Sequence, residues 1–179
     1  MTSGVGYKRE TGSAFLDIPF ALWILILGIF MPLICFATIG LRYTFFMNAA
    51  NQAAHAASHA KSFEQDFPPN MSSQTIAREI AQKACQAFAG IKLNSVTTYI
   101  VITPVAAGSS PSQQASKLST PADEENNLYQ IQVRLSGEIN PFIPLPTGVF
   151  GYKIPGLTNP YPVDLFAKEP SENTQGLNL

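Results

Sequence analysis

Residues 18–41 read IPFALWILILGIFMPLICFATIGL, a run without a charged side chain that Asp17 and Arg42 bracket. An α-helix rises about 1.5 Å per residue, so a helix of this length can cross a hydrocarbon core of roughly 30 Å. Helices in the core of a soluble domain are usually shorter and less uniformly apolar. The run therefore predicts a membrane-spanning helix over residues 13–42 that tethers the remainder of the chain to a bilayer.

The composition limits the kinds of protein this chain can be. Its 179 residues leave room for one modest domain beside the span, and its formal net charge is −1. The eleven Lys and Arg residues are scattered, whereas nucleic-acid binding needs clustered basic side chains, so we expect no nucleic-acid partner. The two cysteines, Cys35 and Cys85, exclude a disulfide framework, and we expect them on opposite sides of the membrane boundary and unpaired.

The flanks of the apolar run bear on its orientation and processing. The run is about twice as long as the apolar region of a secretory signal and contains no small-x-small cleavage site, so we do not expect a cleaved secretory signal. Lys8 and Arg9 precede it, which favours a cytoplasmic N-terminus and a C-terminal domain outside the cytoplasm, although Arg42 follows the run.

The residues directly before the run form a pattern of their own. Lys8 and Arg9 make a short basic leader, Gly12 follows, and Asp17 stands at the start of the apolar helix. This arrangement resembles the class III signal of type IV pilins and pseudopilins. That resemblance implies cleavage by a prepilin peptidase after Gly12, which makes Ser13 the first mature residue and Asp17 the fifth, the position whose acid sets assembly register.

The similarity is closer to one branch of these proteins. Residues 12–22, together with the alanine-rich continuation after Arg42, are similar to TadE/TadG-like proteins of the tight-adherence (Flp) pilus system. The similarity covers about residues 8–60, and the remainder matches only in architecture. Asp17 stands where the family usually has Glu, and Pro19 replaces a small residue. The resemblance implies a minor pseudopilin in a bacterial inner membrane, with other pilin subunits, an assembly platform and a prepilin peptidase as partners.

The chemistry of Asp17 can be stated apart from any family. A carboxylate at the edge of a bilayer is costly unless it is paired with a cation. Cleavage after Gly12 would create a free α-amino group at Ser13, and a neighbouring copy could offer that amine to Asp17. Without cleavage, Asp17 would instead accept hydrogen bonds from the first N–H groups of the helix.

Beyond the span we expect an α+β domain. Residues 43–66 are rich in alanine and continue the helix to about Ser62, and Pro19 and Pro32 are possible kinks. A second helix begins at Ser72 or Ser73 and ends at Gly90. Its expected apolar stripe, at three- and four-residue spacing, is Ile76, Ile80, Ala84, Ala87 and Phe88.

The C-terminal half predicts a small antiparallel sheet. Residues 95–103 and 128–139 have strand composition and alternation, and residues 163–168 form a weaker third strand. Residues 106–127 read as a mobile surface loop, and the six prolines between residues 140 and 162 predict an irregular connection that caps the sheet or offers a docking surface. The predicted segments are a leader (1–12), a span (13–42), a helix continuation (43–66), an extracytoplasmic domain (67–170) and a flexible tail (171–179).

Residues that could carry chemistry are sparse. His55 and His59 are four residues apart on the expected helix and are weak metal candidates, because no acid or third ligand accompanies them in a known spacing. We find no catalytic constellation, expect no cofactor and predict that the chain is not an enzyme. The predicted function is a membrane-anchored pseudopilin-like structural subunit. The alternatives are an uncleaved bitopic scaffold of an envelope complex and a membrane-anchored metal-binding module.

Overall fold

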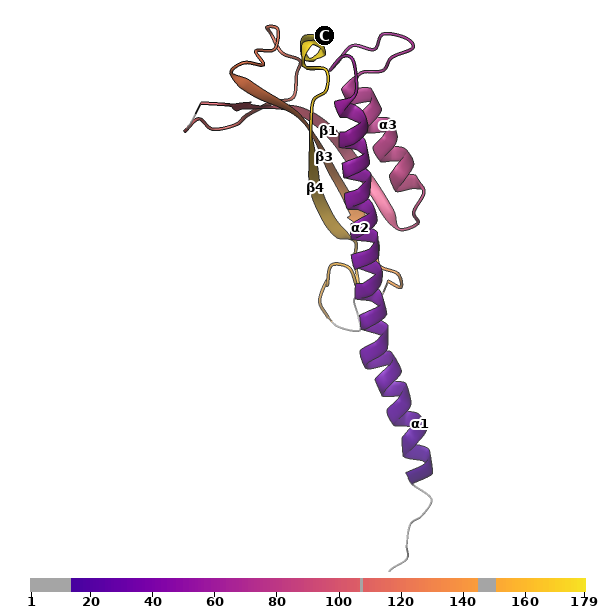
Figure 1. The fold of residues 1–179 in the computed structure, drawn as a ribbon. Helices are drawn as coiled ribbons and strands as arrows, with labels where there is room; N and C mark the ends of the chain where they lie inside the picture. The colour runs from indigo at the N-terminus through magenta and orange to yellow at the C-terminus, as the bar shows by residue number, and fades with distance from the viewer. Residues whose placement is uncertain (1–13, 107, 145–150) are drawn as a thin grey trace, which may run out of the picture.

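A computed structural model describes residues 14–106, 108–144 and 151–179 and shows an α+β protein, in which one long helix projects from a smaller domain (Figure 1). The expected fold class, with a second helix and an antiparallel sheet, is confirmed. In chain order the elements are α1 (Ala14–Leu25), the π-helical turn η1 (Ile26–Phe30), α2 (Met31–Ser58), α3 (Ser73–Gln86), β1 (Ile91–Pro104), β2 (Ser112–Gln114), β3 (Asn127–Ile139), β4 (Tyr161–Pro170) and the 3-10 helix η2 (Thr174–Asn178).

The long helix is interrupted only by η1. Pro32 lies just beyond this turn and has no N–H to donate to the carbonyl of Gly28, four residues earlier. The proline ring also crowds that carbonyl, and a widened π-helical turn relieves the crowding. The expected perturbation at Pro32 therefore takes the form of a π turn in a helix that otherwise continues from α1 into α2.

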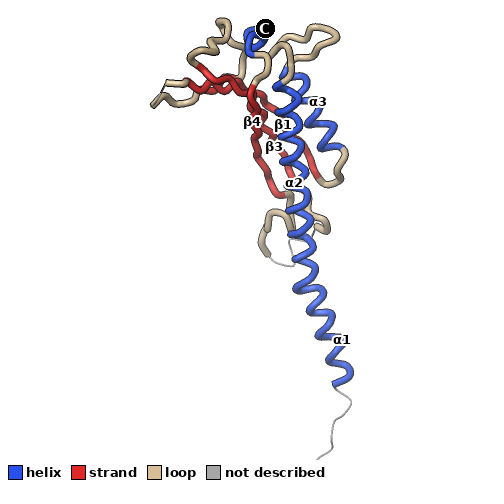
Figure 2. Tube along the Cα trace, in the orientation of Figure 1, coloured by secondary structure: helices blue, strands red, loops and turns tan. Residues whose placement is uncertain are grey.

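The four strands form one antiparallel sheet in the order β2-β1-β3-β4. β3 lies between β1 and β4: Ile131 pairs with Ile100 of β1, and Val133 pairs with Ala167 of β4. Apart from the buried Gln132, its buried residues alternate with more exposed ones, because one face of the sheet packs on the helices. Figure 2 shows the strands lying alongside the upper part of the long helix. We call α3, the sheet and α2 from Phe46 onward the head domain.

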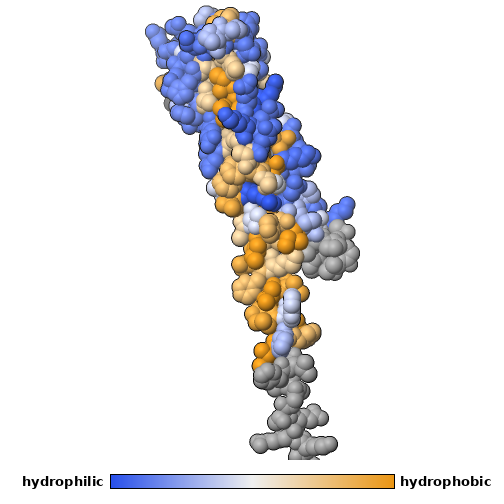
Figure 3. All heavy atoms as spheres, turned by 90° about the vertical axis from the view of Figure 1, so that its right-hand side faces the viewer, coloured by the Kyte–Doolittle hydropathy of each residue, from blue (hydrophilic) through white to orange (hydrophobic). Residues whose placement is uncertain are grey.

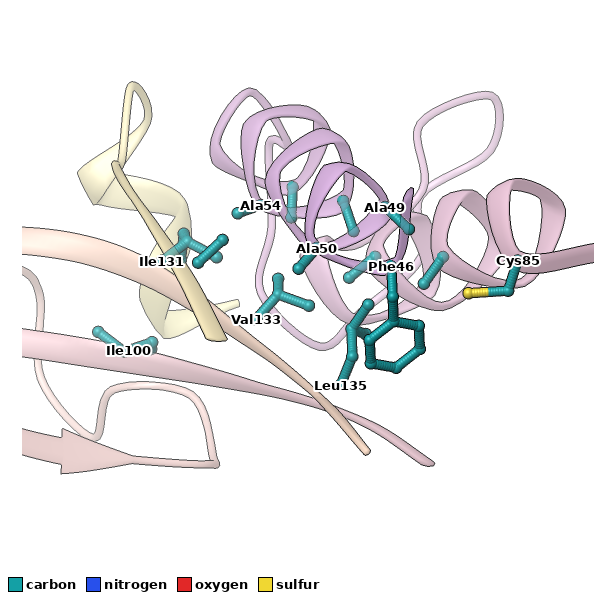
Figure 4. Packing of buried hydrophobic residues seen from close by; sticks show 14 of the residues in the cluster. Phe46, Ala49, Ala50, Ala54, Cys85, Ile100, Ile131, Val133 and Leu135 are labelled. Atoms are coloured by element: carbon teal, nitrogen blue, oxygen red, sulfur yellow. The ribbon is translucent and has the colours of Figure 1, made fainter. Parts of the chain in front are cut away.

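The core of the head domain is built on small side chains from α2. Ala50, Ala53 and Ala54 are essentially inaccessible to solvent, and Phe46 begins the same stripe. Figure 4 shows Phe46, Ala50 and Ala54 on the side of α2 that faces the sheet residues Ile131, Val133 and Leu135. Alanine lets the helix axis approach both the sheet and α3 closely, so the alanines that make this segment a good helix also shape its packing surface.

The buried face of α3 differs from the expected one. The fully buried residues are Ser73, Ala77, Ala81 and Cys85, a stripe at four-residue spacing. The larger residues expected there flank this stripe: Ile76, Ile80 and Ala84 are partly buried, and Ala87 and Phe88 are exposed. The close approach of the alanine-rich α2 accounts for this rotation, since only small side chains fit between two helices at short distance.

Helix α2 ends at Ser58, several residues before the expected end. The Ser58 hydroxyl donates to the carbonyl of His55 at 2.7 Å, and the Ser58 carbonyl accepts from the N–H of Glu172 at 3.0 Å. The C-terminal segment therefore donates a hydrogen bond to a carbonyl at the end of α2. The residues around Ser58 do not predict this contact.

The expectation of a flexible tail after Pro170 is wrong. Residues 174–178 form η2, and Leu177 is buried in the main core. The Gly176 carbonyl accepts from Phe63 N–H at 3.2 Å, and the Leu177 carbonyl accepts from Leu118 N–H at 2.8 Å. The chain terminus lies at the end of the head domain remote from α1 (Figure 1).

The strands are also longer than expected. β1 begins at Ile91 and includes a bulge between Leu93 and Ser95, which interrupted the pattern used to place its start. β4 begins at Tyr161 and contains Pro162, which an edge strand tolerates because one of its sides forms no ladder. The segment expected to be a mobile loop contains β2 and the buried Leu118.

Candidate functional site

The most extensive feature of the surface is the bare apolar helix below the head domain. From Ile18 to Phe30 the large apolar side chains are 42–68% exposed. Figure 3 shows this apolar surface continuing along the lower part of the molecule, below a mainly hydrophilic head. By length and composition the helix is able to cross a membrane. Exposure of this much contiguous apolar surface is typical of a membrane or protein contact.

The threonine hydroxyls in the upper part of this helix are satisfied within it. The Thr38 hydroxyl donates to the Ile34 carbonyl at 2.8 Å, and the Thr44 hydroxyl donates to the Gly40 carbonyl at 3.0 Å. Such bonds to the preceding turn leave no hydroxyl proton to be desolvated in an apolar medium. The threonines therefore do not oppose insertion of the helix into lipid.

Arg42 marks the junction between the bare helix and the head domain. Its Nη1 donates to the carbonyl of Asn140 at 2.6 Å, and its guanidinium lies against Gly90. A Cβ at Gly90 would stand 2.4 Å from the Arg42 Cζ, so a larger residue there would displace the guanidinium. Asn140 N–H in turn donates to the Gly90 carbonyl at 2.8 Å. The first cation after the apolar run thus ties the helix to the end of β3.

An irregular segment descends from the sheet along the helix below this junction. We call its described residues, 140–144 and 151–160, the collar. One arm brings Phe142 and Ile143 beside Cys35, which is fully buried. The other arm brings Gly156, with φ +85°, so close to Ile39 that an added Cβ would stand 2.5 Å from its Cδ1. The collar therefore packs on the helix within residues that the sequence assigns to the span.

The collar bears on an alternative left open by the sequence. The proline-rich connection was expected to cap the sheet or to offer a docking surface. Within its described part, Leu157 is buried while Phe142, Ile143 and Tyr152 are exposed. Docking of a partner on these exposed side chains stays a prediction. The prolines and aromatic residues of this segment indicated an irregular connection, but nothing in the sequence indicated that it lies on the N-terminal helix.

The predicted processing and register residues are placed only in part. Gly12 and Ser13 lie outside the described residues. Asp17 lies in the first turn of α1. Its side chain lies outside the described part of the structure, and its role stays a prediction.

His55, in the last turn of α2, and His59, directly after the helix, lie side by side, as expected from their spacing. Their ring centroids are 4.7 Å apart, and His59 Nδ1 lies 2.6 Å from a carboxylate oxygen of Glu172. Among the described residues, no three His, Cys, Asp or Glu side chains converge in a way that could hold a metal ion. The histidines instead join the end of α2 to the C-terminal segment.

Other perturbed groups in the head domain have structural explanations. The Ser72 N–H donates to Asp66 at 2.7 Å and the Thr75 hydroxyl donates to it at 3.2 Å, and hydrogen bonding to Ser72 and Thr75 lowers the pKa of Asp66. Burial raises the pKa of the Cys85 thiol, which keeps it protonated and weakly nucleophilic. These groups cap α3 and fill its interface, and they do not converge on a common site.

An ion pair on the exposed face of the sheet also has a structural explanation. Nε of Arg134 donates to Asp164 at 2.8 and 3.1 Å, and a second nitrogen of the guanidinium also contacts it. Hydrogen bonding to Arg134 lowers the pKa of Asp164, and the same contact raises the pKa of Arg134. Both side chains are about half exposed, so this pair links β3 to β4 with little net stabilisation.

Comparisons of the chain with protein-family models, with curated proteins and with solved structures gave no match.

Proposed function

We propose that this protein is a membrane-anchored structural subunit of a pilus-type or secretion assembly, with an architecture like that of the pseudopilins. The observation that carries the proposal is the division of one long helix into two functional halves. Its lower half is apolar and exposed, while its upper half is the spine of the head-domain core. A subunit built this way can share its lower helix with lipid or with other copies while its head remains folded.

The proposed mechanism follows from this division. In the bacterial inner membrane the N-terminus faces the cytoplasm, and the head domain lies on the opposite side. A prepilin peptidase removes residues 1–12, and the new amine at Ser13 of one copy pairs with Asp17 of its neighbour. The assembly platform and other pilin or pseudopilin subunits are the partners. This part of the proposal is supported by the resemblance of residues 8–60 to TadE/TadG-like proteins.

The first test is the N-terminal sequence and intact mass of the protein recovered from its native membrane. We expect the chain to start at Ser13. The variant Gly12→Val blocks processing, whereas Gly6→Val, a matched change in the same leader, leaves it unaltered. A native chain that starts at Met1 or Thr2 and keeps the whole span would refute processing and favour the uncleaved bitopic scaffold.

The second test separates register from processing. Replacing Asp17 by Asn removes the charge but keeps the shape, and Asp17→Glu restores the charge with a longer arm. We expect Asp17→Asn to reduce crosslinking between neighbouring copies without changing the N-terminus, and Asp17→Glu to retain crosslinking. Equal crosslinking in all three proteins would show that the carboxylate does not set the register.

A further inference from the structure

We infer that the collar is a membrane-interface element, which rests on the lipid surface around the emerging helix and fixes the depth of the span. The inference depends on the proposed membrane crossing and adds a second lipid contact, made by residues distant in sequence from the span. The collar contacts the bilayer that holds the helix, at the boundary between acyl chains and headgroups.

The collar continues the apolar surface of the helix. Phe142 is 54% exposed and Ile143 is 44% exposed. Together with the helix they line a hollow of about 340 Å³ that is open to the outside. Its lining is wholly apolar: Ile26, Leu27, Phe30, Met31, Ile34, Cys35, Phe142 and Ile143. Any medium that covers the helix at this level therefore also meets the two collar side chains.

The position of the collar along the helix matches the expected edge of the bilayer. A hydrocarbon core of roughly 30 Å needs about 20 helical residues. Counted from Ile18, such a stretch ends near Ala37. The first collar arm shares its hollow with helix residues from Ile26 to Cys35, on the hydrocarbon side of that point, and the second arm lies against Ile39, beyond it. The collar thus extends across the level where hydrocarbon gives way to headgroups.

The chemistry of the first arm suits that location. Irregular backbone is costly in lipid because each unpaired N–H group must be desolvated. Pro141 and Pro144 flank the two apolar residues and have no N–H to desolvate. At the root of the arm, both backbone groups of Asn140 are hydrogen-bonded, to Arg42 and to Gly90. Proline at two of the four positions 141–144 halves the number of backbone donors in this arm, which lowers the cost of placing it at the membrane interface.

The second arm presents the residues expected nearer to water. Tyr152 is 77% exposed and Lys153 is also exposed, and amphipathic side chains of this type lie at the headgroup level. Behind them the arm is held in a defined turn, in which the Ile154 carbonyl accepts from Leu157 N–H at 3.0 Å and from Thr158 N–H at 2.9 Å. An ordered element anchored on the helix can resist sliding of that helix through the bilayer.

The chain offers a direct test because Trp23, within the apolar run, is its only tryptophan. The full-length protein is reconstituted in phosphatidylcholine vesicles that carry a nitroxide quencher at a shallow acyl position. The collar probe combines Trp23→Phe with Phe142→Trp. The matched control combines Trp23→Phe with Phe67→Trp, since Phe67 is 45% exposed and lies beyond the far end of α2. Native circular dichroism is required of both variants.

We expect the collar indole to be quenched severalfold more strongly than the control indole, and the native Trp23 to be protected from water. Quenching of the native protein's Trp23 by a deep acyl nitroxide, with equal and weak quenching of the collar and control probes, would overturn the collar while leaving the membrane span intact. Failure of Trp23 itself to respond to any lipid quencher would refute the span and the collar together. Emission of the collar probe that shifts with protein concentration but not with lipid would assign this face to a contact between copies, which also overturns the inference.

Discussion

Truncation of Phe46 is the sharpest test of the packing between the long helix and the sheet. The Phe46 side chain is 1% exposed and lies beside Leu135 (Figure 4). Its ring also covers Gly137, where an added Cβ would stand 3.0 Å from the Phe46 Cζ. Phe46→Ala therefore removes a whole ring from a site that the surrounding backbone cannot easily fill.

The expected cost follows from that burial. Replacing a fully buried phenylalanine by alanine costs about 3–5 kcal/mol. A domain of this kind has about 5–15 kcal/mol of total stability, so the loss is a large part of it. With a urea dependence of about 1–3 kcal/mol per molar, we expect the midpoint of unfolding to fall by about 2 M. The measurement is pulse proteolysis in urea on the full-length protein in detergent micelles, which reports unfolding of the head domain.

The neighbouring residue provides a matched control. Phe45 is only partly buried and stacks on Phe88 with ring centroids 3.9 Å apart. We expect Phe45→Ala to cost about 1 kcal/mol, the value of an exposed aromatic pair. Equal losses for the two variants would refute the conclusion that α2 is buried in the head through the Phe46 face.

Three further predictions concern the head domain. Gly176→Ala places a Cβ 2.0 Å from the Lys61 carbonyl oxygen, and we expect it to lower the free energy of unfolding by about 1–3 kcal/mol and to expose the C-terminus to carboxypeptidase. Ala81→Leu overfills the interface between α2 and α3 and should cost a similar amount in urea unfolding, whereas Ala87→Leu, on the exposed side of α3, should be nearly neutral. The folded-state pKa of Asp66 is lowered, so its stabilising contribution is complete above the ordinary value of 3.8 and is lost as the pH falls through the lower folded value. Asp66→Asn should abolish that part of the acid dependence, and an unchanged acid-unfolding profile would contradict it.

Much of the fold could be predicted because its signals are local. The alternation in residues 128–139 identified the central strand within one residue of its observed bounds, and Ser72 caps α3 as expected, with its side chain accepting from Thr75 N–H. The face of α3 could not be predicted by choosing its largest apolar residues. That face depends on α2, whose alanines leave room only for Ala77, Ala81 and their small neighbours.

The candidate site, like the fold, could be predicted only where its signals are local. The apolar helix is evident from composition, but the collar brings residues 140–144 and 151–160 back to a helix about a hundred positions earlier in the chain. Asn140 and Arg42 meet at that point through a single hydrogen bond. Neither residue has a sequence neighbour that would indicate the other, so only the tertiary structure reveals the junction.

The sequence by itself therefore determined the elements whose cause is local: the long apolar helix, its alanine-rich continuation, the cap of α3 and the alternating strands. These follow from the hydrophobicity and backbone preferences of residues a few positions apart. Only the tertiary structure decided that α2 ends at Ser58, that the C-terminal residues are packed and that the described parts of the proline-rich segment lie against the helix. Each of these depends on hydrogen bonds and steric fits between distant segments, such as Glu172 N–H with the Ser58 carbonyl and Gly156 with Ile39, which exist only once the chain has folded.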